Sequence, residues 1–313
     1  MKIRYIILCI FWLPFMAGCD DEDSLVPRNS EMTYRFEFPE GDAAWDKDLK
    51  EIAEKFQTVP IYKALDSADL ARSWIVSSAS VRYNAKPLDE ELAEFYTGFF
   101  KDHIFAFLKP ELTQGVLPNY IYLVQDFRQL KPVGGDYSQA NYWSGMDFWA
   151  FCLKMNPENL SQWTKCFDLP RTPWEYKERR GIILQNIIKK MVEKGKIVMP
   201  KEFEEDFDYD GLLYKDTEED SLSYYKRRGI PGMLTEISFN FAANAGLKKT
   251  PILNFISYIH MGIRYTRDSV QIVFPPEKFP KIIKYYDFTM KYMKDNYDWD
   301  VTEMAELPVI KED

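Results

Sequence analysis

The chain has 313 residues, of which 46% are hydrophobic and 28% are charged, and its formal net charge is −9. This length and apolar content are sufficient for one large core. The negative charge disfavours contact with the phosphate backbone of a nucleic acid, so we expect no nucleic-acid partner.

Residues 1–18 have the features of a secretory signal peptide. Basic residues precede an apolar run from residue 5 to 15, and small residues stand immediately before Cys19. The run has roughly half the ~20 residues that a transmembrane helix needs, so it does not predict a membrane span. The sequence Met-Ala-Gly-Cys at 16–19 resembles the bacterial lipobox, which predicts cleavage before Cys19 and lipid attachment to it. The alternative is an ordinary secretory peptide with a cysteine there by chance.

The segment after Cys19 is acidic. Residues 20–23 read Asp-Asp-Glu-Asp, which resembles the export signal that sends lipoproteins of the Bacteroidota to the cell surface. We therefore expect a protein that is lipid-anchored to the outer membrane and surface-exposed, with residues 19–34 as an acidic, flexible tether. The alternative is that these acids only solvate the leader. Removal of the signal peptide takes away two basic residues and no acid, which changes the net charge from −9 to −11.

Residues 35–313 are expected to form a single domain, because no Gly/Ser-rich or Pro-rich linker interrupts them. Apolar residues at helical spacing predict most of its elements, and one β-rich run predicts a strand. The predicted helices cover residues 42–56, 65–75, 88–107, 174–193, 252–265 and 279–297, and the predicted strand covers residues 119–127. We expect an α+β fold that is mainly helical, with a small sheet.

Cys152 and Cys166 are the cysteines that remain once Cys9 is removed with the signal peptide and Cys19 is acylated. In an oxidising compartment they can form a disulfide, provided that their Cα atoms lie within ~7 Å. The sequence leaves this open, and two free, buried thiols are the favoured state.

The chain has two histidines, His103 and His260. Neither lies in the His-Glu-x-x-His spacing, which places two imidazoles one helical turn apart for zinc. A zinc site usually takes several protein ligands, so both histidines are predicted to be ordinary, half-buried helix residues. The sequence also lacks a Gly-x-Ser-x-Gly nucleophile elbow and a Walker loop.

Acidic residues alternate at Asp206, Asp208 and Asp210, and Gly211 follows them. This spacing suits calcium, which takes oxygen ligands from flexible loops. The twelfth position of an EF-hand loop, where a bidentate glutamate is needed, holds Thr217. Two interpretations therefore stay open, a calcium site and an acidic, solvated turn.

The stretch from Tyr142 to Trp149 is rich in aromatic residues. It predicts either a part of the core, because each ring buries much apolar area, or a surface on which sugar rings or peptides stack. Asp147 lies within this stretch. A hydrolase of surface glycans or peptides that uses a carboxylate pair there, with one pKa raised by apolar neighbours, is the enzymatic alternative.

The C-terminal part, from about Arg179, contains a long predicted helix and three further segments. These read Met-Pro-Lys-Glu-Phe-Glu-Glu at 199–205, Asn-Phe-Ile-Ser-Tyr-Ile at 254–259 and Lys-Tyr-Met-Lys-Asp-Asn-Tyr at 291–297. Together with the leader and the chain length, they resemble the zinc metallohydrolase lipoproteins of the Bacteroidota, which are associated with nutrient import. That family is encoded near a paired outer-membrane transporter and its glycan-binding lipoprotein. The resemblance implies a zincin-like, metallopeptidase-like domain with these two proteins as partners.

In that family the long helix carries His-Glu-x-x-His. The corresponding stretch here, within residues 184–194, reads Leu-Gln-Asn-Ile-Ile-Lys-Lys-Met-Val-Glu-Lys and contains no histidine. No zinc ligand can be carried over, and without a metal nothing lowers the pKa of a water for attack. We therefore expect no zinc and no catalytic residue, and a non-catalytic binding or scaffold component near an outer-membrane nutrient uptake system.

Overall fold

The computed structural model describes residues 35–72, 82–130, 137–139, 142–155, 168–210, 224–234, 241–242 and 249–310. Contacts divide the chain into Met1–Glu37 and Phe38–Asp313, and all the elements named below belong to the second unit. Its helices are α2 (Ala44–Phe56), α3 (Ser67–Leu70), α4 (Glu90–His103), α5 (Pro110–Thr113), α6 (Pro173–Glu193), α7 (Glu202–Glu205), α8 (Pro251–Arg264), α9 (Arg267–Val273) and α10 (Pro280–Tyr297), with the 3₁₀ helices η2 (Phe105–Phe107) and η4 (Val301–Ala305). Its strands are β1 (Val59–Ile61), β2 (Arg82–Lys86), β3 (Tyr120–Leu130), β4 (Tyr137–Gln139), β5 (Tyr142–Ser144), β6 (Phe148–Lys154), β7 (Met233–Leu234) and β8 (Phe241–Ala242). The unit is therefore an α+β fold with a small mixed sheet.

Strand β3 is the centre of a six-stranded sheet. It pairs in parallel with β1 and β6 and antiparallel with β2 and β4, while β5 continues the sheet from β6 as an antiparallel strand. The register places Ile121 opposite Trp149 and Tyr122 opposite Ala150. Strands β7 and β8 form a separate two-stranded sheet.

Both faces of the central strands are buried. Ile121 and Trp149 belong to the main hydrophobic core. Tyr122 and Phe148 are also buried, and their rings stack with centroids 4.6 Å apart. In a strand that is buried on both faces, apolar residues follow one another continuously and do not alternate with polar ones. The core interpretation of the 142–149 stretch is confirmed at Phe148 and Trp149, which begin β6.

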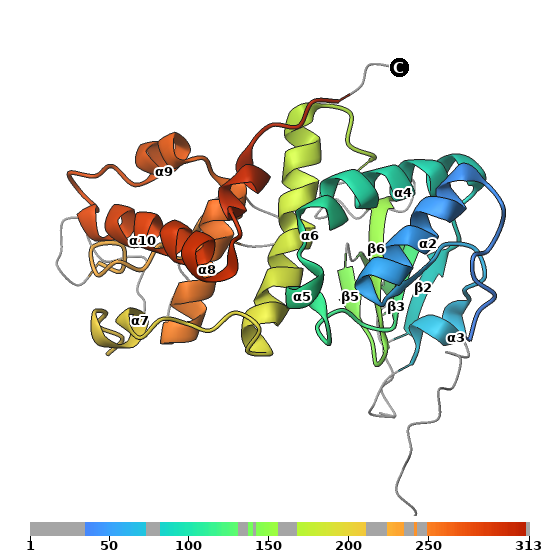
Figure 1. The fold of residues 1–313 in the computed structure, drawn as a ribbon, viewed down its shortest axis with the longest axis horizontal. Coiled ribbons are helices and arrows are strands. Elements are labelled where there is room, and N and C mark those ends of the chain that lie inside the picture. Colours follow the sequence, from blue (N-terminus) through green and yellow to red (C-terminus); the bar gives the residue numbers. More distant parts are fainter. Residues whose placement is uncertain are drawn as a thin grey trace, which may run out of the picture. The chain divides into compact units, whose positions relative to one another are not determined.

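Helix α6 stands between the sheet with its helices α2 and α4 and the C-terminal helices (Figure 1). It contacts α8 and η4, and its buried residues join the same core as those of β3 and β6. Helix α8 is buried around most of its circumference, because α6, α7 and α10 all pack against it. Within the described residues, none of the helices is both long and apolar enough to cross a membrane.

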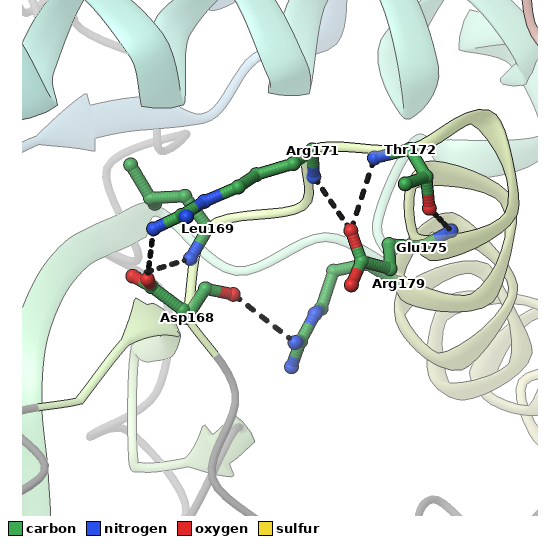
Figure 2. Close-up of polar contacts among 6 residues, drawn as sticks. All are labelled: Asp168, Leu169, Arg171, Thr172, Glu175 and Arg179. Atoms are coloured by element: carbon green, nitrogen blue, oxygen red, sulfur yellow. Dashed lines mark hydrogen bonds and ion pairs between the residues drawn. The ribbon is translucent and has the colours of Figure 1, made fainter.

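Helix α6 begins at a reciprocal capping box (Figure 2). Thr172 Oγ1 accepts the backbone N–H of Glu175 at 3.3 Å, and the Glu175 carboxylate accepts the N–H groups of Arg171 and Thr172 at 2.8 and 3.0 Å. These backbone donors lower the pKa of Glu175. Asp168 accepts a hydrogen bond from the Arg171 guanidinium at 2.6 Å, and its carbonyl accepts one from Arg179 at 3.5 Å. The cap fixes where the helix starts and so which of its residues face the core.

The helices with clear periodicity lie close to their predicted bounds. The observed bounds of α2, α6, α8 and α10 agree with the predicted ones within two residues. Helix α4 is shorter than the helix predicted at 88–107, and it ends at His103. Pro110 begins α5, whereas it was expected to stop one long helix. The helix predicted at 65–75 is found only as α3, and residues 73–81 lie outside the described part. Strands β1, β2, β5 and β6 and helix α9 were not predicted, since most are short and β6 is apolar up to its last residue, Lys154.

The Tyr96 hydroxyl connects α4 to the sheet. It donates to the Val124 carbonyl at 2.9 Å and accepts the backbone N–H groups of Leu153 and Lys154 at 2.7 and 2.9 Å. The pairing of β3 with β6 shifts register at this level. Tyr96 is fully buried, so its hydroxyl satisfies three main-chain groups at an irregularity of the ladder.

Replacement of Tyr96 by phenylalanine is expected to lower the free energy of unfolding by about 2–4 kcal/mol, because it removes a buried partner from three backbone groups. Urea denaturation followed by circular dichroism measures the change. Tyr292→Phe is the matched control, since the Tyr292 hydroxyl donates to the Val198 carbonyl at an exposed position where water can replace it. A Tyr96→Phe variant as stable as this control would contradict the assigned role.

Candidate functional site

Five polar side chains are buried where α8 packs against α6. They form what we name the α6–α8 cluster: Gln185 from α6, Ser257, His260 and Arg264 from α8, and Lys249 just before α8. Each exposes 6% of its surface or less. Positions 257, 260 and 264 recur at spacings of three and four, so these side chains lie on one face of α8. Burial at this depth makes their hydrogen bonds energetically important.

Gln185 joins three elements of the structure. Its Nε2 donates to the Leu234 carbonyl of β7 at 2.9 Å, and its Oε1 accepts a hydrogen bond from Arg264 at 3.0 Å. The Arg264 side chain also runs against Gly181, where a Cβ atom would lie 3.1 Å from Cγ of the arginine. Burial lowers the pKa of Arg264 to about 10, so the guanidinium stays charged at neutral pH. A glycine at position 181 therefore makes room for a buried cation beside α6.

Lys249 places a second buried amine in the cluster. Its Nζ donates to Ser257 Oγ at 2.9 Å and to the Gly232 carbonyl at 3.4 Å, and both acceptors are uncharged. Ser257 in turn donates to the Leu253 carbonyl one turn earlier at 2.8 Å. Burial lowers the pKa of Lys249 to about 8. Lys249 therefore stays protonated at neutral pH, although burial disfavours its charged form.

His260 lies deeper than the half-buried position predicted for it. It is 6% exposed, and among the described residues its Nε2 has no hydrogen-bond partner. Burial, followed by the nearby Arg264 charge, lowers the pKa of His260 to about 3, so the imidazole is neutral at physiological pH. His103, on α4, is half-buried as predicted, and its ring packs against Phe99 and Tyr176 with centroids 5.4 and 4.9 Å away.

The cluster carries net positive charge within the described residues. Lys249 and Arg264 are cationic at neutral pH, since their pKa values of about 8 and about 10 both lie above it. Two fixed cations repel a divalent metal ion and attract an anion. The arrangement therefore suits a structural role better than it suits metal ligation.

The acidic residues Asp206, Asp208 and Asp210 follow α7. The carboxylates of Asp206 and Asp208 contact different partners. The Asp206 carboxylate accepts a hydrogen bond from the Tyr285 hydroxyl, while the Asp208 carboxylate accepts the backbone N–H of Asp210 at 2.9 Å and lies 4.0 Å from the Arg228 guanidinium. Within the described part of the chain, no three histidine, cysteine, aspartate or glutamate side chains are grouped so as to hold a metal ion. Residues 211–223, which continue this loop, lie outside the described residues. Calcium binding stays a prediction.

Asp147 lies in the turn between β5 and β6. Its Oδ2 is 2.9 Å from the Arg72 guanidinium, and the backbone carbonyl of Asp147 accepts the N–H of Tyr120 at 3.1 Å. Among the described residues, the charged group paired with this acid is the Arg72 guanidinium, whereas the hydrolase hypothesis needs a second carboxylate beside it. These contacts give Asp147 a role in joining β3 and Arg72 to the turn.

Cys152 carries a free, buried thiol on β6. Burial raises the pKa of this thiol to about 12, so it is protonated and unreactive at neutral pH. Its candidate disulfide partner, Cys166, lies outside the described residues, and so does the predicted lipidation site, Cys19.

The sequence indicated only part of the α6–α8 cluster. Asn254, Ser257, His260 and Arg264 are polar residues at helical spacing on a mainly apolar helix, which indicates a polar stripe on a buried helix. Gln185 and Lys249 carry no such signal, because they join the stripe only through tertiary contacts.

Removal of the buried amine is expected to change how stability depends on pH. The pKa of Lys249 is about 8 in the folded protein and about 10.4 when unfolded, so between these values the unfolded chain binds more protons. The free energy of unfolding therefore contains a contribution that rises from pH 8 to 10. In Lys249→Met this contribution should vanish, and stability at pH 7 should increase by roughly 1–3 kcal/mol.

Urea denaturation of both proteins across this pH range measures the difference. Lys278→Met is the control, because Lys278 is exposed. A stability difference between Lys249→Met and the native chain that does not vary with pH would contradict the buried, charged state.

The calcium prediction can be measured by melting. If Asp206, Asp208 and Asp210 bind calcium, millimolar calcium should raise the melting temperature relative to EDTA, because a ligand that binds only the folded state adds stability. The triple substitution of these residues by asparagine should abolish the difference. Equal melting temperatures with calcium and with EDTA would rule out the site.

Comparison with known proteins found a likeness to a solved structure. No family model matches the chain, and no curated protein matches it. Among solved structures, the chain is similar to a Bacteroides caccae protein described as a candidate zinc-binding metallo-peptidase, with a TM-score of 0.47 and 14% identity over 84% of this chain and 92% of that one. A likeness at this TM-score and identity assigns no activity to this chain.

Proposed function

We propose that the chain is a lipid-anchored protein of the outer bacterial surface whose folded part binds a ligand instead of hydrolysing peptides. The support for the anchor comes from the sequence, in the signal peptide of residues 1–18, Cys19 and the acids that follow. Its domain, from residue 35 onward, has the degenerate metallopeptidase-like fold that the resemblance implies. It acts as a binding or scaffold component beside an outer-membrane nutrient transporter and a glycan-binding lipoprotein.

The buried face of α6 is the observation that supports a function without peptide hydrolysis. A His-Glu-x-x-His motif centred on Gln185 would need imidazoles at Leu184 and Ile188, and both of these aliphatic side chains are fully buried in the core. Gln185 itself is held by the Leu234 carbonyl and by the Arg264 guanidinium. Aliphatic side chains cannot ligate a metal, and a guanidinium opposes one. This side of α6 is therefore chemically unlike a zinc-binding helix.

Metal analysis with a peptidase assay tests the proposal. The mature chain, beginning at Cys19→Ser to keep it free of lipid, should contain far less than one zinc per chain after incubation with zinc and dialysis, and it should leave a broad panel of peptides uncleaved. Stoichiometric zinc together with chelator-sensitive peptide cleavage would overturn the proposal.

The anchor is tested separately in cells. Labelling with a radioactive fatty acid should occur in the native chain and in Cys152→Ala, the control, and should be lost in Cys19→Ala. Added protease should degrade the native protein on intact cells, whereas replacement of residues 20–23 by alanine should protect the protein and leave labelling unchanged. If the protein is still exposed on the cell surface after these acids are replaced, they are not the signal that directs it there.

A further inference from the structure

We draw no further inference here: the strongest candidate, the cluster of the Tyr224, Tyr225, Phe274 and Phe279 rings around the Lys226 ammonium beside the start of α10, is filled by that lysine of the chain itself, and its rings are buried, so nothing among the described residues shows a face that a ligand could reach.

Discussion

The packing of α8 against α6 is the constraint on which the other features of the domain depend. The two helices approach so closely at Gly181 that a Cβ atom there would press on the Arg264 side chain. Because α7 and α10 pack against α8 as well, even its polar face is buried. Polar side chains in such a position need partners on adjacent elements, and Gln185 provides one by bridging Arg264 and the Leu234 carbonyl.

Helix α6 also holds η4 and the Phe107 ring through a second buried arginine. Arg180 is fully buried, donates to the Met304 carbonyl at 2.7 Å and lies over the Phe107 ring, 4.8 Å from its centroid. Burial lowers the pKa of Arg180 to about 10, so the guanidinium remains charged. Arg180 thus connects α6 both to η4 and to the Phe107 ring. Its capping box at Thr172 sets which residues face each neighbour.

The buried cations of the α6–α8 cluster are costly to stability. Lys249 is dehydrated and hydrogen-bonded only to neutral oxygens in the contacts described for it, an arrangement that folding alone does not favour.

The sequence by itself determined the leader's features and the main helices, because both depend on local order. Apolar spacing located α2, α6, α8 and α10. It did not locate β6, since a strand that is buried on both faces has no alternation to detect.

Tertiary structure alone decided the sites. Gln185 meets Arg264 across 79 residues of chain, and Trp299 meets Phe107 across 192. It also set Asp206 against Tyr285 and Asp147 against Arg72, partners that neither acidic pattern indicated. The physical reason is that a side chain's charge state and partners depend on which distant elements exclude water from it, and local periodicity carries no information about them.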